Sequence, residues 1–197
     1  MLPLRCAVIG DHYVGKSSML TSFTRNELPP VYSKTTYDVH LAVKMFKSKP
    51  YIVYARDISS LTNNRWQSIL AFDSIDIVFI CFAIDDEKSF HNVRHKYLQM
   101  ARMYRANLPI FLVGLKSDLR KLQRHQRRRS RRIRSRGQLK RSMQRLVKVS
   151  AAEDLVSEEK MAAYVECSAY SQIGLEQLFE RAIKIVYNYE STINSCC

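Results

Sequence analysis

Long hydrophobic runs and an export signal are both missing from this chain of 197 residues. Its longest apolar run, from Ile75 to Ile84, is interrupted by Asp76 and falls short of the roughly 20 residues that span a bilayer. The first residues lack the charged and apolar regions of a secretory signal, so we expect no export. The five cysteines show neither metal-ligand spacing nor a disulfide framework. We therefore expect a globular protein in the cytoplasm, where thiols stay reduced.

Acidic residues are absent between 120 and 148, a segment that carries 14 of the 32 lysine and arginine residues. The other 18 basic residues are balanced by 18 acidic ones, so the net charge of +14 belongs to this segment. We expect residues 120–148 to form a flexible basic insertion with no buried face. Such a cluster attracts anionic membrane surfaces, acidic proteins or nucleic acid, and a solvated loop without a partner is the alternative. Nucleic acid ranks lower because the segment has no aromatic side chain to stack on bases.

Apolar periodicity predicts strands that alternate with helices. A near-continuous apolar run at 75–83 and a second apolar run at 109–114 are typical of strands buried on both faces, and strict alternation at 39–45 predicts a strand with one wet face. Further strands are expected at 4–9, 51–55 and 164–167, and helices at 16–23, 90–105, 151 onward and 175–187. The fold class is therefore α/β, with a mostly parallel central sheet covered by helices on both faces. Residues 1–187 would form a single domain and residues 188–197 a polar C-terminal tail.

A phosphate-binding motif, G-x-x-x-x-G-K-[ST], follows the first predicted strand and opens the first predicted helix. Its residues are Gly10, Asp11, His12, Tyr13, Val14, Gly15, Lys16 and Ser17, with Ser18 next along the helix. The glycines let the backbone curl so that its N–H groups and the helix N-terminus face a phosphate. Lys16 would reach the β- and γ-phosphates, and the Ser17 hydroxyl would ligate Mg²⁺. The alternative is an ordinary glycine turn followed by an incidental lysine.

Four further motifs follow in order along the chain. They are Tyr32-Ser33-Lys34-Thr35, Asp57, Lys116-Ser117-Asp118 and Glu166-Cys167-Ser168-Ala169, accompanied by the segment Ser89 to Arg94. Together with the phosphate-binding motif they resemble the Rho/Rac branch of the Ras-like small GTPases, over nearly the whole chain outside residues 120–148. The resemblance implies a Ras-like P-loop fold that binds GTP or GDP with Mg²⁺.

The resemblance also implies a role for each matching position. Ser17, Thr35 and Asp57 would hold the metal. The stem of Lys116 would pack on the base, Asp118 would accept hydrogen bonds from guanine, and Ser168 and Ala169 would complete the base-binding loop. Effector proteins would bind through switch I, and an exchange factor is a further partner that the family implies. The effector-binding positions are Tyr32, Thr35, Tyr37, Asp38 and His40.

Several positions depart from the family pattern where hydrolysis takes place. Leu61 replaces the glutamine that orients the attacking water, Ser60 replaces a glycine near the γ-phosphate, and His12 replaces the second glycine of the phosphate loop. Leu115 replaces the polar residue that usually precedes Lys116. We expect weak hydrolysis and a protein largely in the GTP form, which recruits effectors in cytoskeletal organisation or vesicle trafficking. An active GTPase with altered water positioning and a nucleotide-insensitive binding platform are the alternatives.

The last two residues, Cys196 and Cys197, do not form the C-a-a-X ending of Rho proteins. They resemble the double prenyl acceptor of Rab proteins or a palmitoylation site, and two unmodified cysteines are the alternative. Two lipid chains would anchor the protein stably, and we expect the basic segment to support that attachment. The expected location is a cytoplasmic membrane face, at the plasma membrane, Golgi or endosomes.

Overall fold

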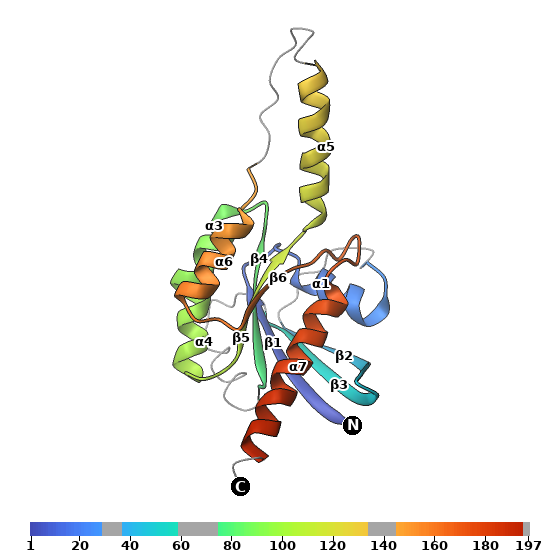
Figure 1. Cartoon of the computed structure of the whole chain (residues 1–197), viewed down its shortest axis with the longest axis vertical. Coiled ribbons are helices and arrows are strands. Elements are labelled where there is room, and N and C mark those ends of the chain that lie inside the picture. The colour runs from blue at the N-terminus through green and yellow to red at the C-terminus, as the bar shows by residue number, and fades with distance from the viewer. Residues whose placement is uncertain (29–36, 59–74, 134–144, 195–197) are drawn as a thin grey trace.

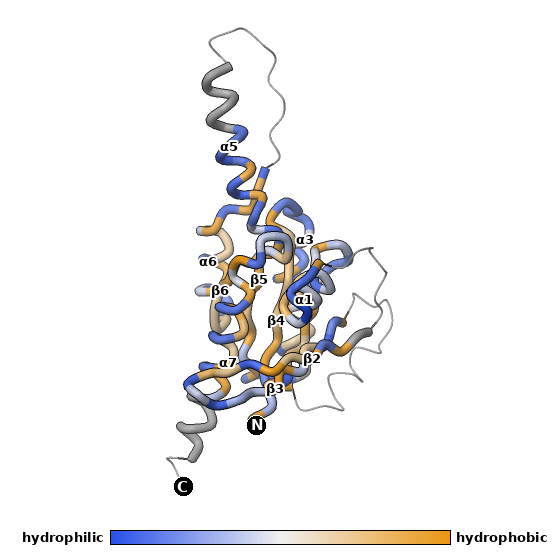
Figure 2. The backbone as a smooth tube through the Cα atoms, turned by 90° about the vertical axis from the view of Figure 1, so that its right-hand side faces the viewer, coloured by the Kyte–Doolittle hydropathy of each residue, from blue (hydrophilic) through white to orange (hydrophobic). Residues whose placement is uncertain are grey.

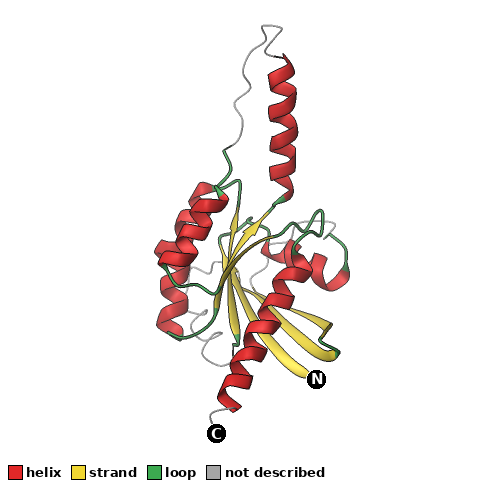
Figure 3. Ribbon diagram, viewed as in Figure 1, coloured by secondary structure: helices red, strands yellow, loops and turns green. Residues whose placement is uncertain are grey.

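The computed structural model describes residues 1–28, 37–58, 75–133 and 145–194. A twisted sheet lies between two layers of helices (Figures 1 and 3). Its strands are β1 (Leu2–Gly10), β2 (Tyr37–Phe46), β3 (Lys49–Ile58), β4 (Ile77–Ala83), β5 (Ile110–Leu115) and β6 (Ala163–Glu166). The helices are α1 (Lys16–Arg25), α3 (Glu87–Asn92), the π-helix η1 (Val93–Leu98), α4 (Gln99–Tyr104), α5 (Asp118–Ile133), α6 (Val149–Glu158) and α7 (Leu175–Asn194).

The sheet has the strand order β2-β3-β1-β4-β5-β6. Only the β2–β3 pair is antiparallel, and the other four pairings are parallel. Every residue of β4 and β5 is buried, as their continuous apolar sequence predicts for central parallel strands. The predicted α/β fold with a mostly parallel sheet is therefore confirmed. In Figure 2 these central strands are among the most hydrophobic parts of the chain.

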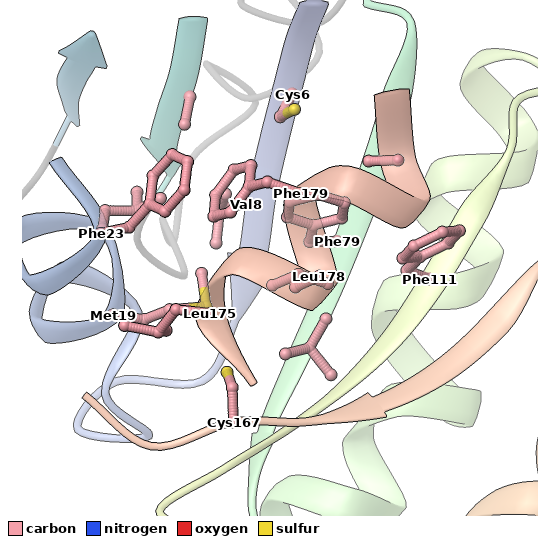
Figure 4. Close-up of a cluster of buried hydrophobic side chains, with 14 of the residues drawn as sticks. Cys6, Val8, Met19, Phe23, Phe79, Phe111, Cys167, Leu175, Leu178 and Phe179 are labelled. Atoms are coloured by element: carbon pink, nitrogen blue, oxygen red, sulfur yellow. The ribbon is translucent and has the colours of Figure 1, made fainter. Parts of the chain in front are cut away.

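Two clusters of buried side chains form the core, one on each face of the sheet. On the face covered by α1 and α7, the rings of Phe23 and Phe179 stack with centroids 3.6 Å apart, and Phe79 meets Phe179 edge-on at 5.4 Å (Figure 4). On the other face, residues of η1, α4 and α6 such as Leu98 and Leu155 pack over β4 and β5. Both faces of the central strands are thus sealed, and ligand chemistry is left to the strand ends.

The basic segment differs from the prediction at both of its ends. Residues 118–133 form the continuous helix α5, because Arg, Lys, Gln and Leu all favour helix. The negative charge of Asp118 also stabilises the helix, since it lies at the positive N-terminus of the helix dipole. At the other end, Val147 is 5% exposed and belongs to the core, and its N–H donates to Ile84 O at 2.8 Å. The expectation of a segment with no buried face is therefore wrong at Val147, and the helix at residues 118–133 was not predicted from the sequence.

The C-terminal helix is longer than the sequence predicts. α7 continues to Asn194, so residues 188–194 are helical and are not an irregular polar tail. Ile185, Val186 and Tyr187 pack against the core, which supports the helix beyond the expected end. Cys196 and Cys197 lie outside the described residues. No helix in the described part of the chain is long and apolar enough to cross a membrane.

α5 and α7 point in opposite directions (Figure 1). α5 leaves the carboxyl edge of the sheet just after β5, whereas α7 runs back along the sheet toward the amino ends of the strands. At 1.5 Å per residue the two helices are about 24 Å and 30 Å long.

β2 carries an apolar stripe on its exposed face. Val39, Leu41, Val43 and Met45 are 41–63% exposed, whereas the alternate residues Ala42 and Phe46 pack against the core. The strict alternation correctly predicts a strand with one wet face, but the wet face is the one that carries the four alternating apolar residues. Small Ala42 and flat Phe46 fit under α1 and α7.

The β2–β3 hairpin supplies a test of backbone strain. Its turn residues Lys47 and Ser48 both have left-handed backbones, with φ of 46° and 61°, a pattern that favours Asn-Gly. We expect Ser48→Gly to raise the free energy of unfolding by about 1 kcal/mol, measured from urea midpoints. The matched control is Ser157→Gly within α6, which should lower it by about 0.5–1 kcal/mol. Destabilisation by both substitutions would contradict the strain.

Candidate functional site

A cavity of about 370 Å³ opens at the carboxyl ends of the parallel strands. This is the edge where open α/β sheets bind their ligands, and the volume suits a small molecule. Ten predicted nucleotide-binding residues line it: His12, Tyr13, Gly15, Lys16, Ser17, Ser18, Asp57, Lys116, Asp118 and Ala169. Leu28, Leu115, Leu119 and Tyr170 also line the cavity, and the sequence motifs did not single out Leu28, Leu119 or Tyr170 for this role.

The loop between β1 and α1 requires glycine at its first position. Gly10 has φ of +147°, and a Cβ there would lie 2.2 Å from the carbonyl oxygen of Cys81 on β4. Gly15, with φ of +109°, precedes α1 and leaves its first N–H groups facing the cavity. The loop can therefore cradle an anion with its main chain.

Lys16 folds back over this loop. Its ammonium donates to Gly10 O at 2.9 Å and to Asp11 O at 2.7 Å, and the residue is only 6% exposed. Burial lowers the pKa of Lys16 from its ordinary value, while the charge of Asp57 acts in the opposite direction. The site therefore concentrates positive charge where an anion would compensate the cost of burial.

Asp57, at the end of β3, forms the acidic wall of the cavity. Its Oδ2 accepts a hydrogen bond from the Ser17 hydroxyl. The residue is fully buried, and within the described part of the chain its Oδ1 has no hydrogen-bond partner. An orphaned carboxylate oxygen beside a serine hydroxyl fits a hard divalent cation such as Mg²⁺, bound directly or through water. Ser17 and Asp57 would hold the ion; Thr35, the third predicted ligand, lies outside the described residues.

The opposite end of the cavity presents Asp118 at the first turn of α5. Its Oδ1 accepts from the Ser168 hydroxyl at 2.6 Å, and Ser168 Oγ accepts from the N–H of Ser171 at 3.1 Å. Ser168 is fully buried, whereas Asp118 is only half-buried and lines the cavity. Asp118 is thus held with a carboxylate oxygen available to N–H donors of a bound base.

Lys116 stands beside this pair in a left-handed conformation, with φ of +64°. Its ammonium lies 3.2 Å from Asp85 Oδ1, a partner that the motifs did not reveal. The contact draws the side chain along the cavity wall, where its stem can cover one face of a planar ligand. The only sequence signal for Asp85 was its position just after a buried strand.

Asp11 contributes its backbone to the site but turns its side chain away. Its Oδ1 accepts from the Tyr97 hydroxyl at 2.7 Å, and its Oδ2 accepts from Asn92 Nδ2 at 2.6 Å. Both donors come from the α3–η1 region, where the π-helical turn widens the helix. These bonds tie the phosphate loop to the neighbouring helix.

A second link joins the root of α5 to the loop after β6. The guanidinium of Arg120 donates to Glu166 Oε2 at 2.7 Å and to Val147 O at 2.9 Å, and Tyr164 donates to Glu166 Oε1 at 2.5 Å. Because each partner lies far from Arg120 in sequence, spacing alone gave no signal of the cluster. It holds the loop that carries Ser168 against the start of α5.

The remaining predicted residues fall into three groups. Gly10 and Val14 shape the phosphate loop from outside the cavity, with Val14 only 1% exposed in the core. His40 is half-buried on β2, and Tyr37 and Asp38 are described only by their place on that strand. The predicted effector residue Tyr32, the predicted metal ligand Thr35, and Ser60 and Leu61 lie outside the described residues.

A family model described as the Ras family matches residues 5–188. The match covers the phosphate loop, Asp57, Asp118 and the loop of Ser168. The chain belongs to the Ras family. As a Ras-family protein it is a P-loop small GTPase by descent, a family that binds GTP or GDP with Mg²⁺. The two ends of the cavity then have distinct roles, because Lys16 and the loop N–H groups suit phosphates and Asp118 suits a guanine base.

Guanine recognition is tested at Asp118. We expect Asp118→Asn to weaken GTP binding by at least about tenfold, because the amide places a donor where the carboxylate accepts from the base. Ser168→Ala removes only the supporting bond and should weaken binding by about fivefold. Displacement of a fluorescent guanine nucleotide measures both variants. Equal displacement by ATP and GTP from the wild type would contradict the assignment.

Proposed function

We propose that this Ras-family protein is a Rho-like guanine-nucleotide switch that hydrolyses GTP slowly and is therefore largely GTP-bound. The observation that carries the proposal is a single cavity that combines the buried Lys16, the Ser17–Asp57 pair and the Asp118–Ser168 pair. These groups match the phosphates, the metal and the base of a guanine nucleotide, respectively. Binding chemistry is retained even though the residues expected to assist hydrolysis are replaced.

The binding residues would act together on the nucleotide. Lys16 would exchange its two carbonyl contacts for phosphate oxygens, and the N–H groups at the start of α1 would add further donors. When bound, Mg²⁺ supplies positive charge that neutralises the β- and γ-phosphates. Asp118 would accept from the guanine N–H groups while Ser168 keeps its carboxylate oriented.

Slow hydrolysis follows from what the chain offers to the attacking water. Leu61 has neither donor nor acceptor, so it cannot orient a water molecule in line with the γ-phosphate. His12 lines the cavity, where an imidazole takes the space that a glycine would leave to water or to an activator's arginine. Ser60, next to Leu61, replaces a glycine and so reduces the backbone freedom at that position. Effector recruitment through residues 32–40 would then last longer than in a fast GTPase.

The bound nucleotide distinguishes the proposal from its alternatives. GTP in the freshly purified protein supports a switch held in its GTP form, GDP supports a working GTPase, and no nucleotide supports a binding platform. Mass spectrometry of the nucleotides released by acid or heat gives the answer without any variant.

Hydrolysis itself is tested by restoring the family residues. We expect the triple variant His12→Gly/Ser60→Gly/Leu61→Gln to hydrolyse GTP at least about tenfold faster than the wild type in single-turnover assays. Leu61→Gln alone should gain little, because His12 still occupies the space. Nucleotide affinity serves as the control and should change by less than the hydrolysis rate. A wild-type rate equal to that of the triple variant would overturn the proposal.

We also propose that the protein is attached to a cytoplasmic membrane face by lipid on Cys196 and Cys197. Only Ser195 lies between Asn194, the last residue of α7, and Cys196, so an anchored tail would hold the amino-end edge of the sheet toward the membrane. The nucleotide cavity at the opposite edge would then face the cytosol and its effectors.

Membrane attachment is tested by cell fractionation. We expect the wild type in the membrane fraction and Cys196→Ser/Cys197→Ser in the soluble fraction, because two acyl or prenyl chains bind stably at about 0.8 kcal/mol per buried CH₂. Ser195→Ala is the matched control, since it alters the same tail without removing a thiol. Full retention of the double serine variant on membranes would contradict the lipid anchor.

A further inference from the structure

α5 is a projecting rod of positive charge. Eight of its 16 residues are Arg or Lys, and its single acidic residue, Asp118, stands at its first position inside the nucleotide cavity. The helix leaves the sheet edge and extends beyond the rest of the described chain (Figure 1). Lys121 and Arg124 are exposed, so packing against the body does not explain why these two residues are basic.

The basic positions cover more than half of the helix circumference. At 3.6 residues per turn, the positions of Lys121, Arg124, Arg128 and Arg132 fall on one side of the helix, within an arc of about 140° that also includes 120, 127 and 131. Arg129 widens this arc to about 200°. A flat surface reaches less than half of a cylinder, whereas the walls of a groove reach both sides.

The composition also argues against insertion into a membrane. Among the 16 residues only Leu119, Leu122 and Ile133 are apolar, and none is aromatic. Leu119 is already partly buried against the body, which leaves too little apolar area to enter a bilayer. Seven of the eight basic residues are Arg, whose planar guanidinium binds phosphate through two parallel hydrogen bonds.

We propose that α5 binds double-stranded DNA by lying in its major groove and pairing its arginines with phosphates on both strands. A major groove about 12 Å wide admits one α-helix. Eight positive charges over about 24 Å lie opposite a duplex that carries one negative charge per roughly 1.7 Å of axis. The lack of aromatic residues, which disfavours binding to unpaired bases, has no bearing on a helix that contacts backbone phosphates.

The root of α5 fixes the helix for this task. Arg120 is anchored to Glu166 and to Val147 O, so the first turn is held against the body while the basic positions that follow extend outward. A helix that is already formed and anchored loses less conformational entropy on binding than a disordered basic segment does. The proposal does not depend on the bound nucleotide or on the state of the C-terminal cysteines.

The test is fluorescence anisotropy of the full chain with a labelled 20-base-pair DNA duplex and the matching RNA duplex. We expect micromolar affinity for the DNA duplex near physiological salt, a steep loss of that affinity as salt rises, and weaker binding to the RNA duplex, whose major groove is deep and narrow. The variant Arg124→Gln/Arg127→Gln/Arg128→Gln/Arg131→Gln should bind at least tenfold more weakly, with a salt slope smaller by about 3 to 4. The matched control, Lys88→Gln/Lys148→Gln/Lys160→Gln/Lys184→Gln, removes the same charge elsewhere and should keep both affinity and slope.

Two results would overturn the proposal. One is stronger binding to vesicles that contain phosphatidylserine than to either duplex, and the other is an equal loss of duplex binding in the two glutamine variants. Guanine-nucleotide affinity is measured on the same preparations and should be unchanged in both variants, which also shows that they are folded. If the wild type binds no guanine nucleotide, the proposed switch function is refuted, whereas the duplex result is unaffected.

Discussion

The approach of Gly10 to the carbonyl of Cys81 is the constraint on which the nucleotide site depends. No side chain fits there, since a Cβ would lie 2.2 Å from that oxygen, and the chain can therefore leave β1 close against β4. This tight exit places α1 directly behind the phosphate loop and returns the Lys16 ammonium to Gly10 O. The same edge gathers Asp57 from β3 and Asp118 from the segment after β5. A single close contact between two parallel strands thus sets the floor of the whole cavity.

The sequence was sufficient for those parts of the fold that depend on short-range pattern. Buried runs identified β4 and β5, and the phosphate-loop motif placed Lys16 and Ser17 correctly at the cavity. Contacts between distant residues were not predictable in this way, because Asp85, Tyr97 and Glu166 act through partners 31, 86 and 46 residues away. Helix ends were also missed, since the length of α7 depends on packing against the core and periodicity alone does not reveal it.

The sequence did not predict the helix at residues 118–133, because the positive charge of that segment argues against regular structure. A dense basic segment repels itself as an unfolded chain, and that argument favours a loop. In α5, however, the chain also gains the backbone hydrogen bonds of a helix, and the Arg120–Glu166 contact fixes the first turn. Arginine is a good helix former whose long side chain can carry its charge away from the axis into water. Local propensity and one anchored root therefore outweigh the repulsion.

The length of α5 separates the charge of its outer turns from the phosphate loop. Position 127 lies nine residues beyond Asp118, which corresponds to about 13 Å along the helix and exceeds the screening length of about 8 Å at physiological ionic strength. The positive charge beyond that position adds little to the potential at the phosphate loop, where the buried Lys16 and the backbone N–H groups dominate. A helix can thus carry a large excess of charge without altering nucleotide affinity. By the same reasoning, a nucleotide triphosphate in the cavity leaves the outer turns of α5 free to attract a second polyanion.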